Sequence, residues 1–191
     1  EYELEEKEAN KMLQEAKKLN NPVGITLAYQ CMANIYRITY RIEEAADVLK
    51  KAYKAALKIN EGYVIEINRS LIATYEELND FPNWIKWIKI QDNYLNQIIR
   101  KEPGAEARLR GWLMMTYISY LSYYTKVDLS QAEKYLHLAE KYNMVGYGTF
   151  DYYYSQARYD YFQASGQLEK VLAELEPLRE IFKKSSPSMY S

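Results

Sequence analysis

The stretch YQCMANIYRITYRIEEAADVLKKA, Tyr29 to Ala52, decides the fold of this 191-residue chain. Its large and small apolar residues recur at spacings of three and four: Tyr29, Met32, Ala33 and Tyr36 in the first half, and Ala45, Leu49 and Ala52 in the second. Residues spaced in this way lie on one face of an α-helix. Small residues let two helices approach closely, and large ones fill the gaps between them. The stretch therefore predicts two packed amphipathic helices.

The spacing of the second half returns elsewhere in the chain. Ala9, Leu13 and Ala16 repeat it near the start, and Ala132, Leu136 and Ala139 repeat it later, with weaker copies that begin at Trp84 and Val171. A pattern that returns every few tens of residues is typical of stacked helical repeats. The chain has only 7 Gly and 5 Pro, and several of these fall in short connections such as LNNPVG (19–24), LNDFPN (78–83) and ASGQ (164–167). Such clusters mark turns between helices.

Residues 25–57 resemble the tetratricopeptide repeat (TPR), whose first helix reads aromatic-x2-Leu-Gly-x2-Tyr and whose second reads Ala-x3-Phe-x2-Ala. The resemblance implies an all-α, right-handed superhelical solenoid of about four antiparallel helix pairs, preceded by one orphan helix. We expect a single domain over residues 1–191. Its parts are the second helix of a truncated repeat (1–22), repeats at 23–60, 61–102 and 103–146, and a last repeat with a tail (147–191). Because Glu1 begins in mid-pattern, we expect a fragment of a larger protein.

In the TPR family the first helix of each pair lines a concave groove, so the groove residues follow from the repeat register. In the first full repeat, the stripe that avoids the packing residues carries Gln30, Asn34 and Arg37. The same register selects, in the later repeats, Arg69, Ala73 and Glu76, then Tyr117, Leu121 and Tyr124, then Gln156, Asp160 and Gln163. A groove that is polar at one end and aromatic in the middle suits an extended peptide or a helix of a partner.

The 21 tyrosines allow two interpretations. In DYYYSQARYDYF (151–162), aromatic side chains point to all sides of a helix, so the helix must be buried on several sides. We therefore expect most tyrosines to pack in the core with their hydroxyls at a wet margin. The alternative is a ligand surface lined by tyrosine, and a concave pocket that encloses Tyr117, Tyr124 and Tyr153 would favour it.

Residue types that carry catalysis are scarce. The chain has one histidine, His137, and one cysteine, Cys31, so a His-rich metal site and an internal disulfide framework are excluded. Cys31 lies between packing residues of a predicted helix, where no feature of the sequence lowers the pKa of its thiol. We therefore predict a protein that is not an enzyme and that has no catalytic residues, no metal site and no cofactor.

The repeat, the groove and the missing catalytic groups together predict a protein- or peptide-binding scaffold, the recognition part of a larger regulatory protein. Some TPR proteins hold a peptide's terminal carboxylate with Lys and Asn; Asn34 fits the Asn position, but Gln30 stands where Lys is expected. The alternative is a domain that senses a sugar or short peptide in a bacterial signalling or transcription regulator, since long-period repeats of this kind resemble those of bacterial regulators.

The net charge of −1 argues against nucleic acid as a partner of this domain. No apolar run reaches the about 18 residues that a membrane helix needs, so we expect no membrane insertion by this segment. The single cysteine fits a reducing compartment, and we favour the cytoplasm over the periplasm. The orphan helix is expected to expose Met12, Leu13 and Ala16, a face through which two copies of the chain would form a homodimer.

Overall fold

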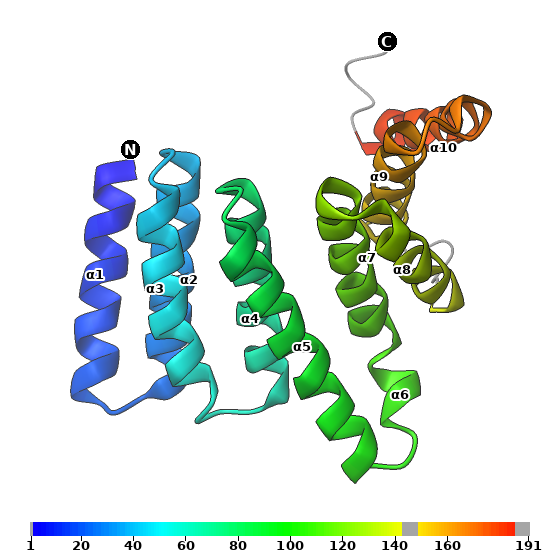
Figure 1. Ribbon diagram of the computed structural model, residues 1–191. Helices are drawn as coiled ribbons and strands as arrows, with labels where there is room; N and C mark the ends of the chain where they lie inside the picture. Colours follow the sequence, from blue (N-terminus) through cyan, green and yellow to red (C-terminus); the bar gives the residue numbers. More distant parts are fainter. Residues whose placement is uncertain (1, 143–148, 186–191) are drawn as a thin grey trace. The chain divides into compact units, whose positions relative to one another are not determined.

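The computed structural model describes residues 2–142 and 149–185, and these residues form helices and no strand. This confirms the all-α prediction. The helices, shown in Figure 1, are α1 (Tyr2–Lys18), α2 (Pro22–Ile38), α3 (Ile42–Ala56), α4 (Glu61–Glu77), α5 (Phe81–Lys101), α6 (Ala105–Arg108), α7 (Arg110–Val127), α8 (Leu129–Lys141), α9 (Thr149–Ala164) and α10 (Leu168–Ser185). The chain divides into two compact units, Glu1–Gln91 and Asp92–Ser191. We describe each unit by itself.

Unit 1 is a row of helices in which each packs on the next. α1 packs on α2, α2 on α3 and α3 on α4, in the order that Figure 1 shows. The first half of α5 pairs with α4 through a buried polar contact, where the Asn68 side-chain amide donates to Gln91 Oε1 at 2.7 Å and to the Trp87 carbonyl at 3.2 Å. Unit 1 thus contains the α2/α3 and α4/α5 pairs, preceded by the single helix α1.

Small residues lie where the α2 and α3 helices touch. Ala33 is 2% exposed, and Ala45 and Ala52 are fully buried. Leu49 fills the same core at 2% exposure. A methyl group at these positions is the largest side chain that closely packed helices admit without displacing a neighbour. The three- and four-residue spacing within Tyr29 to Ala52 therefore corresponds to the packing of these two helices.

Four connections between helices share one three-residue turn, at residues 19–21, 39–41, 78–80 and 165–167. The middle residue has a positive φ in each: Asn20 at 50°, Tyr40 at 58°, Asn79 at 51° and Gly166 at 73°. The amide of the third residue donates to the carbonyl five residues earlier in every case, at distances from 2.7 to 3.1 Å. This is the Schellman motif, which satisfies free carbonyls at a helix end. The same backbone motif therefore recurs inside three helix pairs and between α1 and α2.

Unit 2 contains the α7/α8 and α9/α10 pairs, with α7 packed on α9 and the short α6 before α7. An ion pair of 2.8 Å between Arg158 of α9 and Glu174 of α10 joins the last pair. The aromatic stretch on α9 supplies core residues, because Tyr154, Tyr161 and Phe162 are each 6% exposed or less.

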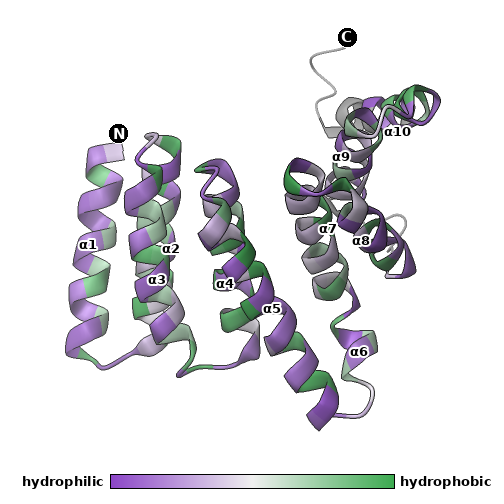
Figure 2. Ribbon diagram, viewed as in Figure 1, coloured by the Kyte–Doolittle hydropathy of each residue, from purple (hydrophilic) through white to green (hydrophobic). Residues whose placement is uncertain are grey.

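The N-terminal helix differs from the prediction. Leu13 and Ala16 are buried, whereas Met12 is 37% exposed. α2 covers the inner face of α1, with Gly24 so close that a Cβ there would lie 2.9 Å from the Cβ of Ala16. The expectation that all three residues are exposed is therefore wrong for Leu13 and Ala16. Figure 2 shows α1 mainly in the hydrophilic colours, so the argument for a homodimer through an apolar face of this helix is lost.

Candidate functional site

The last turns of α2 and α4 border a depression of about 410 Å³ in unit 1. Asn34, Arg37 and Ile38 line it from α2, and Glu77 lines it from α4. We call it the α2–α4 depression. It combines an amide, a guanidinium, a carboxylate and an aliphatic side chain, so it offers hydrogen bonds and apolar area to the same ligand.

An ion pair spans this depression. Arg37 Nε donates to Glu77 Oε2 at 3.1 Å, and the two side chains are 40% and 42% exposed. An exposed pair of this kind contributes about 0–1 kcal/mol to stability. The bond uses one of the five N–H donors of the guanidinium. A ligand carboxylate therefore has donors to bind on Arg37, and little folding energy opposes the release of Glu77.

Two of the predicted groove residues, Asn34 and Arg37, meet in the depression, and two lining residues were missed. Ile38, 55% exposed, and Glu77 each follow directly after a predicted position. Residues i+7 and i+8 straddle the same helix face because each residue turns the helix by 100°. A prediction based on the whole exposed face of each helix, rather than on one stripe of residues, would have included Ile38 and Glu77.

The other polar groove residues of unit 1 lie outside the lining of the depression. Gln30 is half-buried on α2. Arg69 pairs with Glu66 along α4 at 3.5 Å, and Glu76 is half-buried beside Glu77. Their part in ligand binding stays a prediction.

The predicted tyrosines of α7 contact two further tyrosines, one on α8 and one directly after its end. Tyr124 stacks on Tyr135 with ring centres 5.2 Å apart, and Tyr117 packs on Tyr142 at 5.5 Å. Leu121, which shares their predicted stripe, is fully buried. Burial raises the pKa of Tyr117 to about 12. Both rings therefore take part in packing between paired helices, and a role for their free edges in binding stays a prediction.

A half-buried carboxylate, Asp92, lies beside this tyrosine cluster. Tyr120 stacks on Tyr135 at 4.4 Å, and its hydroxyl donates to Asp92 Oδ2 at 3.3 Å. Asn96 donates to the same carboxylate at 2.8 Å. Burial raises the pKa of Asp92, although these two hydrogen bonds act in the opposite direction. The contact fastens the second half of α5 to α7 within unit 2.

The predicted residues of α9 lie at partly exposed positions. Gln156 Nε2 donates to Asp160 Oδ1 at 2.9 Å, one turn further along the helix. Tyr153 is 39% exposed and meets Tyr152 edge-on with ring centres 5.4 Å apart. These side chains form a polar and aromatic strip on α9, and its function stays a prediction.

Side chains of the types that bind metal are not clustered in the described ranges. No cluster of three or more His, Cys, Asp or Glu side chains that would hold a metal ion occurs within residues 2–142 and 149–185. His137 lies on the exposed side of α8, 3.2 Å from Glu140, and Cys31 is exposed on α2. Over the same ranges, none of the helices is both long and apolar enough to cross a membrane.

Comparison with known proteins identifies the fold. No protein-family model and no curated protein sequence matches the chain. The crystal structure of BtubC (BKLC) from P. vanneervenii is similar with a TM-score of 0.58 at 15% identity; the match covers 86% of this chain and 66% of BtubC, just under two thirds of its length. A single-residue variant of a Podosopora anserina putative kinesin light chain, described by its nearly identical TPR-like repeats, has a TM-score of 0.51 at 13% identity, and the match covers 97% of this chain and 96% of that one.

At these identities the likeness concerns the fold alone. It agrees with the helix pairs and with the TPR resemblance of residues 25–57. The chain therefore has the fold of a TPR-like helical repeat protein.

Proposed function

We propose that this chain is a non-catalytic scaffold that binds a peptide segment of a partner protein in the α2–α4 depression, as the recognition part of a larger regulatory protein. The ion pair between Arg37 and Glu77 across an exposed depression is the observation that supports the proposal. TPR-like folds are typical of protein-interaction scaffolds, but a fold does not by itself give a function. The argument therefore depends on the residues of the site.

The side chains of the depression select a peptide with a carboxylate beside an aliphatic residue. Arg37 offers a charge-assisted hydrogen bond to the carboxylate, in place of Glu77. Asn34 lies nearly one turn earlier on α2 and is exposed; its amide has both a donor and an acceptor for a peptide backbone. Ile38 offers apolar area to the neighbouring side chain. Glu77 then acts as an internal carboxylate that competes with the ligand for Arg37.

The test begins with short random peptides displayed against the wild-type chain. Peptides that bind are measured by fluorescence polarisation with Arg37→Ala, Glu77→Gln and, as a control of equal charge change, Lys54→Ala, whose side chain is exposed on α3. We expect Arg37→Ala to weaken binding about tenfold, as loss of a hydrogen bond to a charged group does. We expect Glu77→Gln to strengthen binding and Lys54→Ala to leave it unchanged. Equal affinities for wild type and Arg37→Ala, or a library without binders, would contradict the proposal.

A second candidate is a sensor of a small molecule, such as a sugar or a short peptide. The volume of about 410 Å³ supports it, because this value lies within the range of small-ligand sites, about 300–1,000 Å³. A thermal-shift screen against sugars and short peptides separates the two candidates, since a ligand that binds only the folded state raises the melting temperature. A dose-dependent rise with a sugar, lost in Arg37→Ala, would favour the sensor.

A further inference from the structure

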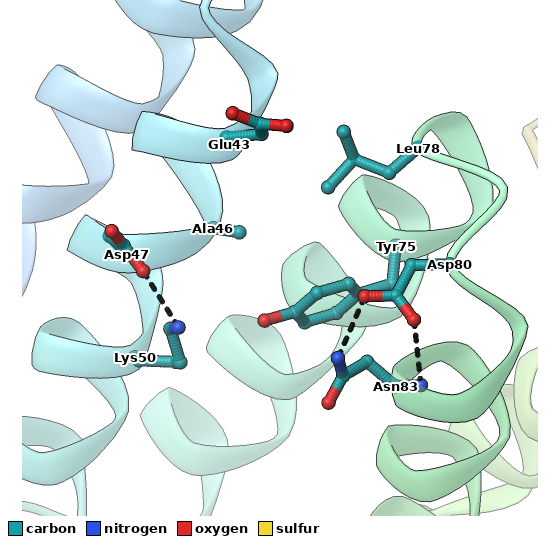
Figure 3. Close-up of a pocket in the computed structure, with 8 residues that line it drawn as sticks. All are labelled: Glu43, Ala46, Asp47, Lys50, Tyr75, Leu78, Asp80 and Asn83. Carbon is teal, nitrogen blue, oxygen red and sulfur yellow. Dashed lines mark hydrogen bonds and ion pairs between the residues drawn. The ribbon is translucent and has the colours of Figure 1, made fainter.

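A second pocket of unit 1 lies on the other side of the last turn of α4. It has a volume of about 330 Å³ and lies between the N-terminal half of α3, the end of α4 and the start of α5. We call it the α3–α5 pocket. Figure 3 shows side chains of all three helices around it. Leu78 lines this pocket while its neighbour Glu77 lines the α2–α4 depression, so the two sites are distinct.

Three of the eight side chains that line the α3–α5 pocket are apolar or aromatic: Ala46, Tyr75 and Leu78. Ala46 is 3% exposed, Tyr75 is 5% exposed and Leu78 is half-buried. Figure 3 shows the Tyr75 hydroxyl directed into the pocket, toward α3. The Asp47 carboxylate and, to a smaller extent, the Tyr75 hydroxyl raise the pKa of the Lys50 ammonium. The hydroxyl reaches the open space of the pocket, where its O–H can donate to a ligand.

The rim of the pocket is acidic. Glu43, Asp47 and Asp80 bring three negative charges and Lys50 brings one positive charge, which leaves a formal net charge of −2. Two of the carboxylates are already engaged: Asp47 Oδ1 accepts from Lys50 at 2.7 Å, and Asp80 accepts from the Asn83 backbone at 3.2 Å and from its side chain at 2.7 Å. Glu43 is exposed, and within the described ranges it has no ion-pair partner. The charge open to a ligand is therefore on Glu43 and on the second oxygen of Asp47.

We propose that the α3–α5 pocket binds a basic side chain, lysine or arginine, of a partner protein. Lysine and arginine carry a cationic group on a long apolar stem. The stem packs on Tyr75 and Leu78, and the cationic group pairs with Glu43 and Asp47 at the rim. The O–H of Tyr75 donates to a carbonyl of the ligand backbone. This inference does not depend on the proposed function of the α2–α4 depression.

The test uses N-acetyl-arginine methylamide as the probe and N-acetyl-citrulline methylamide as its uncharged analogue of nearly the same shape. Each is titrated into the ¹⁵N-labelled 191-residue chain and followed by NMR. We expect saturable shifts of the Ala46, Asp47 and Leu78 amides with the arginine compound only. Added salt should weaken this binding, because the rim charges are exposed. Equal shifts with citrulline, or no saturable shift at these amides, would overturn the proposal.

Two substitutions and one control locate the binding group. Glu43→Gln should weaken the arginine probe about threefold, as expected for loss of one exposed ion pair. Tyr75→Phe keeps the ring and should also weaken binding, because it removes the hydroxyl. Glu44→Gln is the matched control: it lies in the same turn of α3 and is paired with Arg41, outside the pocket. A loss in Glu44→Gln as large as in Glu43→Gln, or no loss in Glu43→Gln, would show that the pocket does not hold the probe.

Discussion

Gly24→Ala tests how tightly α1 and α2 are packed. A Cβ at Gly24 would lie 2.9 Å from the Cβ of Ala16 and 3.2 Å from Asn21 Nδ2, whereas carbon atoms in contact lie about 3.5–4.0 Å apart. Overpacking costs about 1–3 kcal/mol. Alanine gains about 0.8–1.0 kcal/mol over glycine inside a helix. We therefore expect Gly24→Ala to lower the free energy of unfolding by about 1 kcal/mol, measured by urea denaturation and far-UV circular dichroism.

Gly62→Ala is the matched control, because Gly62 lies in the first turn of α4. Its new Cβ would meet only Asn60 Oδ1, at 3.3 Å, the side-chain oxygen that caps the start of α4. We expect it to stabilise the protein by up to about 1 kcal/mol. The double variant Ala16→Gly with Gly24→Ala should show a favourable coupling of about 1–2 kcal/mol, since it removes one of the two clashing methyl groups. Stabilisation by Gly24→Ala equal to that by Gly62→Ala, or strict additivity in the double variant, would refute the reasoning.

Three further predictions concern the core. Ala45→Leu adds a large side chain at a fully buried position and should cost about 1–3 kcal/mol in thermal unfolding; a cost below about 0.5 kcal/mol would contradict close packing there. Tyr120→Phe should cost about 1–3 kcal/mol in urea denaturation, because the half-buried Asp92 loses a donor, and an unchanged midpoint would count against that bond. Burial raises the pKa of Glu174, although Arg158 acts in the opposite direction, so the folded state binds more protons than the unfolded state. Its contribution to the free energy of unfolding is therefore fullest below about pH 4.5, the ordinary pKa, and is lost as pH rises through the raised pKa. Glu174→Gln should remove this loss when the free energy of unfolding is measured against pH. Parallel curves for the wild type and the variant would disprove the assignment.

The architecture was predictable because its determinants are local and periodic. The close contact of α2 with α3 needs a small residue at Ala33 and at Ala45, and both are visible in one stretch of sequence. The turn at 39–41 was less visible. Asn20, Asn79 and Gly166 are residue types that favour a left-handed conformation, but Tyr40 is not, so this turn follows only from the repeat pattern on either side of it.

The candidate site was predictable in part. Asn34 and Arg37 follow from the repeat register alone, and they meet in the α2–α4 depression. Glu77 was missed because a helix face is broader than one stripe of residues. The contact of Tyr124 with Tyr135 depends on how far α8 is rotated against α7, which the spacing within either helix does not specify. Register thus predicts the side of a helix, but tertiary packing decides which of its residues remain open.

The repeated turn also shows where this protein is not optimised for stability. Tyr40 holds the same left-handed conformation as its Asn and Gly counterparts, and its side chain is 89% exposed, so it gains almost nothing by packing. The left-handed region costs a residue with a Cβ about 1–2 kcal/mol, and asparagine tolerates it better. Folding therefore gives no reason to keep an aromatic residue here. An engineer who wanted a more robust binding scaffold would begin at this turn, with Tyr40→Asn or Tyr40→Gly.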